Sequence, residues 1–230
     1  MAKGAYVGVD GVAHKVKKIY TGVDNVARKV KKGYVGVGGV ARPFFSAESR
    51  LEYYGVVTPL SVARFALAAT TVGNYALFGG GDYAVDAYDD ALAKSTPTAL
   101  SVARRYLAAT TVGNYALFGG GQVHAYEQKD TVDAYNDTLT RSTPQTLSVA
   151  RVDLAATTVG NYALFGGGYG SNSTYKDTVD AYNISLTRSI PTALSSARYA
   201  LAATTVGNYA LFGGGSGNIS STVDVYYSEN

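Results

Sequence analysis

The sequence offers few side chains from which a catalytic centre could be built. It contains two histidines, His14 and His124, and no cysteine. A metal cluster or a histidine-based triad needs several such groups at one place, and these two histidines lie far apart along the chain. No unique pair of carboxylates stands out for acid–base chemistry, because most acidic residues recur with a repeat. We therefore expect no catalytic residue, no metal site and no cofactor.

One aspartate and one arginine recur in each copy of a long repeat. They are Asp86, Asp133, Asp180 and Asp224, and Arg64, Arg104, Arg151 and Arg198. We interpret a charge that is present once per repeat as a tie between strands or neighbouring repeats; the alternative is a ring that binds an ion or an acid. A glycine triplet also recurs, but none opens a helix or precedes a P-loop lysine, so we expect it to end a strand rather than bind phosphate.

The repeat is built around Thr-Val-Gly-Asn-Tyr-Ala-Leu-Phe-Gly-Gly-Gly at residues 71–81. This stretch returns unchanged at residues 111–121, 158–168 and 205–215. Gly-Asn between two short runs of apolar and β-branched residues is typical of a two-residue hairpin turn. Full repeats begin at Leu60, Leu100, Leu147 and Leu194, which gives spacings of 40, 47 and 47 residues. Four short strands within such a length form one blade of a β-propeller.

This repeat resembles the kelch repeat. The shared features are an arginine before the first strand, a glycine doublet closing the second, and an aliphatic-Asp-x-Tyr third strand. The fourth-strand tryptophan of the family is replaced by Leu92, Leu139 and Leu186. The resemblance implies an all-β fold, a kelch-like β-propeller of four repeats over residues 46–230, preceded by a stalk of β-hairpin repeats.

The two ends of this domain predict how the ring closes. The last unit stops after the third-strand sequence Val223 to Tyr227, while residues 51–60 match the sequence between third and fourth strands. We expect a strand near residues 55–60 to complete the last blade, which would close four blades and leave no open edge. The main alternative is that two chains merge into an eight-bladed ring.

Residues 1–45 carry a different repeat, of 14 residues, which begins at Tyr6, Tyr20 and Tyr34. The centres of its copies, Asp10-Gly11, Asp24-Asn25 and Gly38-Gly39, suit type I′ turns. The pattern therefore predicts three hairpins, the first with Val9 opposite Val12 and Tyr6 opposite Lys15. The third copy has Pro43-Phe44-Phe45-Ser46 in place of Lys-Val-Lys-Lys, which we interpret as the junction to the next domain.

The predicted register places valines on one face of each hairpin and basic residues on the other. In the first copy the faces hold Val7, Val9, Val12 and Val16, against Tyr6, Gly8, Ala13, Lys15 and Lys17. A single hairpin cannot bury its valine face alone. We therefore expect this segment to pack on itself, on sister chains in a homo-oligomer, or on a host structure.

The charge of the chain is concentrated in these hairpins. Residues 1–42 hold seven Lys and two Arg against Asp10 and Asp24, which gives +7, while the whole chain has +3. Lysine on exposed strands guards against edge pairing, and single tyrosines 14 residues apart form no platform for stacking bases. We therefore expect a solvated basic face and no nucleic-acid partner. No apolar run reaches 18 residues, and the first ten residues lack an apolar core of about 7–15 residues. We therefore also expect no membrane span and no signal peptide.

The hairpin pattern resembles the short repeats at the N-termini of tail and fibre proteins of phages and prophages from Gram-positive gut bacteria. This implies a non-enzymatic structural or attachment protein, located in a virion or outside the cell. Residues 1–45 would then join other virion or fibre subunits. Two alternatives stay open: an architectural fibre or filament subunit without a ligand, and, less favoured, a carbohydrate-active enzyme.

The copies differ at two places, the pair of residues after Ala-Arg and the loop after the glycine triplet. Loops joining strands two to three and four to one emerge on the same side of a propeller, so both variable sets should gather on one face. Exposed tyrosines there are typical of recognition surfaces. We expect a cell-surface glycan or protein receptor to bind through Tyr83, Arg105, Tyr106, His124, Tyr126, Tyr169, Tyr175 and Tyr199. The alternative is drift at unconstrained surface positions.

Overall fold

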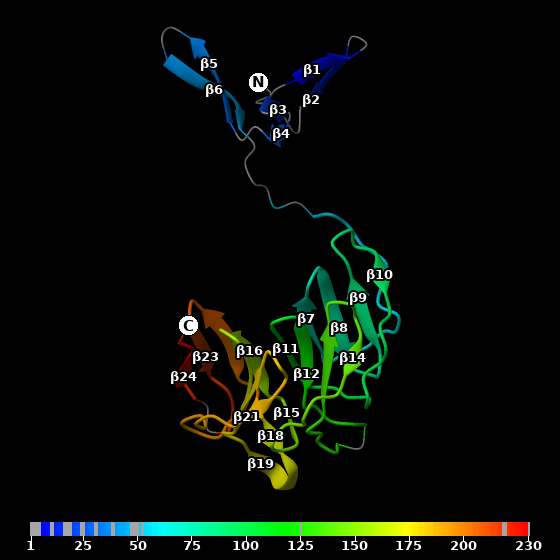
Figure 1. The fold of residues 1–230 in the computed structure, drawn as a ribbon, viewed down its shortest axis with the longest axis vertical. Coiled ribbons are helices and arrows are strands. Elements are labelled where there is room, and N and C mark those ends of the chain that lie inside the picture. The colour runs from blue at the N-terminus through cyan, green and yellow to red at the C-terminus, as the bar shows by residue number, and fades with distance from the viewer. Residues whose placement is uncertain are drawn as a thin grey trace. The chain divides into compact units, whose positions relative to one another are not determined.

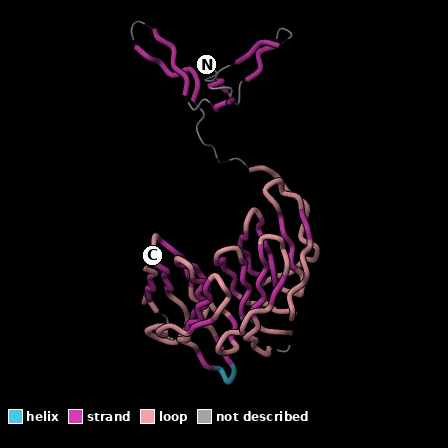
Figure 2. The backbone as a smooth tube through the Cα atoms, viewed as in Figure 1, coloured by secondary structure: helices cyan, strands magenta, loops and turns pink. Residues whose placement is uncertain are grey.

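The computed structural model divides the chain into two compact units, residues 1–55 and 56–230. It describes residues 6–9, 12–15, 20–23, 26–29, 32–37, 40–46, 51, 53–124, 126–217 and 220–229. Within these residues the regular structure consists of β-strands and one 3₁₀ turn, η1 (Ser171–Ser173) (Figure 2). The predicted all-β class is confirmed.

The first unit contains three antiparallel hairpins. They are formed by β1 (Tyr6–Val9) with β2 (Val12–Lys15), β3 (Tyr20–Val23) with β4 (Val26–Lys29), and β5 (Lys32–Val37) with β6 (Val40–Ser46). Val9 lies opposite Val12 and Tyr6 opposite Lys15, as predicted. The expected turn centres, Val16 and Lys17 lie outside the described residues.

The third hairpin differs from the junction expected at Pro43 to Ser46. These residues continue β6, with Pro43 opposite Tyr34 after a shift in register between Gly33 and Tyr34. An irregularity of this kind tolerates proline, which has no amide hydrogen to donate to the ladder. The division between the units therefore falls after Gly55, later than the expected boundary at residues 45 and 46.

In the second unit each long repeat folds into its own antiparallel sheet, with strands in chain order. Sheet 1 contains β7 (Leu67–Val72), β8 (Tyr75–Gly80), β9 (Val85–Tyr88) and β10 (Lys94–Ser95). Sheet 2 contains β11 (Ala108–Val112), β12 (Tyr115–Gly119), β13 (Val132–Asn136) and β14 (Arg141–Ser142). Sheet 3 contains β16 (Ala155–Val159), β17 (Tyr162–Gly166), β20 (Val179–Asn183) and β21 (Arg188–Ser189). Sheet 4 contains β22 (Ala202–Val206), β23 (Tyr209–Gly213) and β24 (Val223–Tyr227).

The turn between the first two strands of each sheet follows from the invariant Gly-Asn. Val72 pairs with Tyr75 across Gly73 and Asn74, and Gly73 has a φ of +52°. Glycine adopts this left-handed conformation without the steric cost that a β-carbon brings. The hairpin predicted from Gly-Asn is confirmed in all four repeats.

The four sheets follow one another along an open arc, with their first strands side by side (Figure 1). Each sheet packs face to face on the next through buried aliphatic and aromatic side chains. Threonine hydroxyls join successive first strands, with Thr70 Oγ1 lying 2.8 Å from Thr111 Oγ1. The alanines and threonines of the first strands are small enough to allow this close approach.

The closed ring expected from the sequence is not formed by the described residues. Val56 to Leu60 form no strand, and β24 pairs only with β23 among the described strands. The hydroxyl of Tyr88 in sheet 1 donates to the Thr58 carbonyl at 2.7 Å. Tyr135 makes the equivalent bond to the Thr98 carbonyl at 2.8 Å, and Lys94 and Ser95 still pair with sheet 1. The bond is therefore a regular feature of the repeat, and sheet 4 lies at the other end of the arc from sheet 1 (Figure 1).

The recurring arginine and aspartate form an ion pair in every sheet, buried in sheets 1 to 3 and with Asp224 partly exposed in sheet 4. The Arg151 Nη2 to Asp180 Oδ2 distance is 2.7 Å, and neither side chain is exposed. The same Arg151 nitrogen donates to the Phe165 carbonyl at 3.0 Å, and the Ser148 amide donates to Asp180 at 2.9 Å. The expected structural role is confirmed, because the pair ties the residues before the first strand to the second and third strands.

Candidate recognition face

Backbone bridges bring the two variable sets of residues together. Arg105 pairs with Gln122, and Tyr199 pairs with Ser216. In the third repeat the bridge grows into a small sheet of β15 (Arg151–Val152), β18 (Tyr169–Gly170) and β19 (Thr174–Tyr175). The residues after Ala-Arg therefore lie beside the loop that follows the glycine triplet, on one side of the arc, as predicted.

The second residue of each variable pair has a left-handed backbone. The φ angles are 54° at Ala66, 56° at Tyr106, 52° at Asp153 and 51° at Ala200. This conformation is unfavourable for residues other than glycine, and here hydrogen bonds between repeats hold it. The Tyr106 amide donates to the Ala66 carbonyl at 2.8 Å, and the Asp153 amide to the Tyr106 carbonyl at 3.1 Å. The variable side chains are thus displayed from a fixed backbone.

A first cluster, the arginine cluster, consists of Phe65, Arg105, Tyr106 and Tyr126. The Arg105 guanidinium lies 5.8 Å from the ring centre of Phe65, 5.9 Å from that of Tyr106 and 5.8 Å from that of Tyr126. Such distances allow cation–π attraction, which orders the arginine. The cluster joins the first and second repeats and presents one positive charge among exposed rings.

A second cluster, the tyrosine cluster, consists of Tyr169, Tyr175 and Tyr199. Tyr169 and Tyr175 are cross-strand partners, and their ring centres lie 5.9 Å apart. Tyr175 stacks on Tyr199 of the next repeat with ring centres 5.2 Å apart and an angle of 14° between the planes. The three phenols form a rigid amphipathic surface, since each ring is held by the other two.

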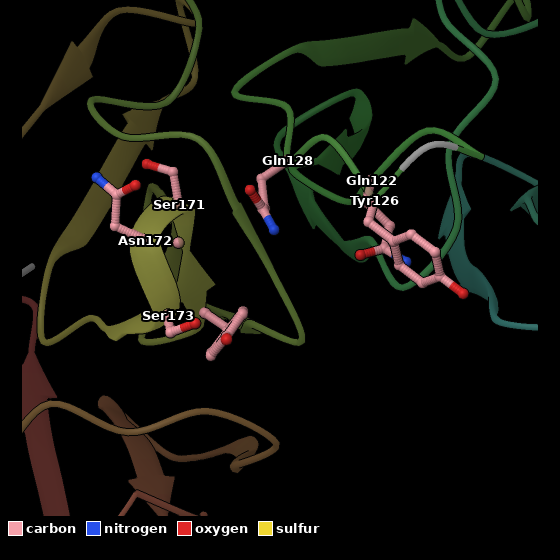
Figure 3. Close-up of a pocket in the computed structure, with 8 residues that line it drawn as sticks. Gln122, Tyr126, Gln128, Ser171, Asn172 and Ser173 are labelled. Atoms are coloured by element: carbon pink, nitrogen blue, oxygen red, sulfur yellow. The ribbon is translucent and has the colours of Figure 1, made fainter.

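A shallow depression of about 440 Å³ lies between the two clusters. Figure 3 shows its walls, with Gln122, Tyr126 and Gln128 from the loop after β12 and Ser171–Ser173 from the loop after β17. Its lining offers amide and hydroxyl groups beside an aromatic ring, which is a surface able to hydrogen-bond and stack at once.

The side of the sheets that carries the Gly-Asn turns also has a depression, of about 490 Å³. Asn114, Asn161 and Ile184 line it together with residues of the neighbouring turns. Most of this lining is identical from copy to copy, whereas the lining of the first depression is not. A depression alone therefore does not indicate which side binds a partner; the clustering of variable side chains distinguishes the first side from the second.

The structure gathers six of the eight predicted site residues into these two clusters. Tyr83 and His124 are exposed, and neither makes an aromatic contact within the described residues. The prediction omitted Phe65, Gln122 and Gln128, as well as Ser171–Ser173. The sequence could have identified these residues, because all of them lie at positions that vary between repeats.

The described part of the chain has neither a cluster of metal-ligating side chains nor a membrane-spanning helix. Within the described residues no three His, Asp or Glu side chains come together as metal ligands. No helix in that part of the chain is long and apolar enough to cross a bilayer. What the face offers is tyrosine hydroxyls, amides and Arg105, which are groups able to hydrogen-bond and stack.

Asp153 is the one acid on this face whose ionisation the fold opposes, because burial raises the pKa of its carboxyl. A raised pKa in the folded state means that the charged form costs stability above that pKa, and that the cost vanishes below about 3.8, where the unfolded state also protonates. We expect Asp153→Asn to raise the melting temperature at pH 7 and to leave it unchanged near pH 3. Thermal unfolding at both pH values measures this. An equal gain at both would show that charge is not the cause.

Comparison with known proteins adds no family to this description. No protein-family model matches the chain, and no curated protein matches its sequence. The fold and the face described above define the class: an all-β protein of small antiparallel sheets with a variable aromatic side.

Proposed function

We propose that this chain is a non-enzymatic structural and attachment protein of a virion or extracellular fibre, and that it binds a glycan or protein receptor through its variable face. The observation that supports this most is the convergence of the variable residues. Seven side chains that differ between otherwise near-identical repeats lie in two ordered aromatic clusters around one depression. Drift at unconstrained positions would not be expected to order them in this way.

The proposal assigns separate roles to the two units. The four sheets would be blades of a kelch-like β-propeller that carries the recognition face. The basic hairpins of residues 1–45 would join the protein to sister chains or to other subunits of a phage tail-type particle. Each hairpin pairs its own two strands, so its valine face needs a partner beyond the hairpin.

A glycan is the receptor chemistry that the face suits best. Tyrosine rings stack on the apolar faces of sugars, while hydroxyl, amide and guanidinium groups hydrogen-bond to sugar hydroxyls. Arg105 adds preference for an acidic sugar, because it presents a fixed positive charge.

The test is a glycan and protein array probed with the full chain, with each ligand that binds then examined for turnover by mass spectrometry. We expect reversible binding with the ligand recovered intact. Cleavage or oxidation of a bound glycan would contradict the proposal in favour of a carbohydrate-active enzyme. Absence of binding across both arrays would favour the purely architectural fibre subunit.

A further inference from the structure

The three contacts between neighbouring sheets are copies of one interface. In each, a face of valine, leucine and alanine on the earlier sheet meets a face of phenylalanine and tyrosine on the later one. Between sheets 1 and 2, for example, Val72, Val85 and Ala87 are buried with Phe118 and Tyr135. We call these the aliphatic face and the aromatic face of a sheet.

In each copy of the interface, a phenylalanine ring of the later sheet packs directly against a glycine of the earlier sheet. A β-carbon built on Gly79 would lie 2.8 Å from the Phe118 ring. At Gly119 and Gly166 it would lie 2.7 Å from the rings of Phe165 and Phe212, respectively. Carbon atoms do not approach so closely without a bond, so only glycine lets the ring sit at this point.

Hydrogen bonds between neighbouring sheets also repeat from one interface to the next. Threonine hydroxyls pair at 2.8 Å between Thr70 and Thr111 and at 2.7 Å in the two later interfaces. The amide of the last glycine in each triplet donates to the carbonyl of the next repeat's arginine, at 2.8 Å in all three cases. These donors and acceptors are Gly81 and Arg104, Gly121 and Arg151, and Gly168 and Arg198.

Sheet 4 carries an aliphatic face that nothing covers among the described residues. Val206 is 63% exposed, whereas the equivalent Val159 in sheet 3 is 3% exposed. Val225 is 54% exposed. A β-carbon on Gly213 would meet only Val223 of its own sheet, at 3.5 Å, so its place for a ring is empty.

Sheet 1 carries the complementary aromatic face, which is partly covered. Phe78 is half-buried, whereas the equivalent Phe118 is fully buried, and Tyr88 is 8% exposed. Phe78 packs edge-to-face on Tyr88 at 5.9 Å, as the equivalent rings do in the other sheets, but no earlier sheet supplies a glycine for it. Sheet 1 lies at the opposite end of the arc from sheet 4 (Figure 1). One chain thus has the two faces that a fourth interface needs, but they lie on sheets 1 and 4 and do not meet within the chain.

We propose that the aliphatic face of sheet 4 binds the aromatic face of sheet 1 in a second copy of this chain. Phe78 of one copy would fill the place at Gly213 of the other, and Thr71 would pair with Thr204, which continues the three interfaces within the chain. Two copies joined in this way at both ends leave neither face exposed. The interface is head to tail, because sheet 4 of one chain meets sheet 1 of the other.

The free edge of β24 supports the same partner. In sheet 1, Lys94 and Ser95 pair with Tyr88 and Ala87 on the third strand, but sheet 4 lacks such a fourth strand. Thr58 accepts from Tyr88 as Thr98 accepts from Tyr135. Tyr54 and Gly55 therefore take the places of Lys94 and Ser95, four and three residues before that threonine. Residues 54 and 55 of the second copy would complete sheet 4, so the strand pairing expected within one chain forms between two.

The test measures the mass of the full chain in solution across a range of concentrations, by light scattering after gel filtration. We expect twice the 24.0 kDa of one chain, with Gly213→Ala and Phe78→Ala each weakening association by at least about tenfold. Ile190→Ala is the control, because Ile190 is an exposed apolar residue whose place is taken by Thr96 and Thr143 in other repeats. A mass of one chain at all concentrations would overturn the proposal.

A mixture of the two variants separates this interface from association through the hairpins. The Gly213→Ala chain keeps Phe78, and the Phe78→Ala chain keeps Gly213, so an equal mixture should regain one intact interface and form pairs again. Circular dichroism of each variant at low concentration confirms that it folds. Association that neither variant weakens, or a mixture no stronger than its components, would contradict the head-to-tail arrangement.

Discussion

Replacing Arg151 by alanine should lower the free energy of unfolding by about 3–5 kcal/mol, because it leaves the Asp180 carboxylate buried without its main counter-charge. Both side chains are fully buried, and their closest nitrogen and oxygen atoms are 2.7 Å apart. The change also removes the hydrogen bond to the Phe165 carbonyl. Denaturant unfolding of the variant and the parent chain measures the loss.

Arg188→Ala is the matched control for this prediction. Arg188 Nη1 lies 3.6 Å from the other oxygen of Asp180, but its side chain is partly exposed. Solvent screens such a pair, so we expect a loss below about 1 kcal/mol. Equal losses in the two variants would show that the buried pair is not the main tie within the sheet.

The equivalent ion pairs of sheets 1 and 4 make the stability of the fold depend on pH. Burial opposes ionisation of Asp86, but hydrogen bonds from Arg64 and Ser61 outweigh it and lower the pKa of this carboxyl. The pKa of Asp224 is lowered in the same way, by Ser195 and Arg198 against burial. A lowered pKa contributes stability above about 3.8, which is lost as the pH falls through the folded-state value.

Replacing Phe165 by alanine should cost about 3–5 kcal/mol, because a fully buried ring leaves a cavity between two sheets. Its ring touches Gly119 of the preceding sheet and packs on Tyr182 at 5.9 Å. Denaturant unfolding at a concentration where chains are separate measures this. Phe78→Ala is the control, since Phe78 has the same partner within its own sheet but no preceding sheet. A loss at Phe78 as large as that at Phe165 would mean that the contact between sheets contributes little.

The sequence predicted the strands of the long repeat well because their signals are local. Gly73-Asn74 specifies its turn, and the recurring arginine and aspartate specify one tie per sheet. The openness of the arc was not predictable in this way. Ring closure depends on the angle that each sheet makes with the next, and this angle accumulates over several interfaces.

The candidate face was predicted in its location and only partly in its residues. Strand alternation and topology place the variable loops on one side. The direction of each side chain depends on residues with a left-handed backbone, such as Tyr106 and Asp153. Because these residues are not glycine, the sequence gives no sign of this conformation. Phe65 was omitted because its contact with Tyr106, at 6.4 Å between ring centres, joins two repeats, and Tyr83 was included although the clusters leave it out.

Titration of an array-selected ligand against face-specific variants tests the central claim most directly. Arg105→Ala and Tyr175→Ala change the two clusters, while Asn114→Ala and Asn161→Ala change the depression on the turn side. We expect each cluster variant to weaken binding by on the order of 1–2 kcal/mol without loss of folding, and the asparagine variants to bind as the parent chain does. Loss of binding in the asparagine variants, with the cluster variants intact, would place recognition on the opposite face and contradict the account.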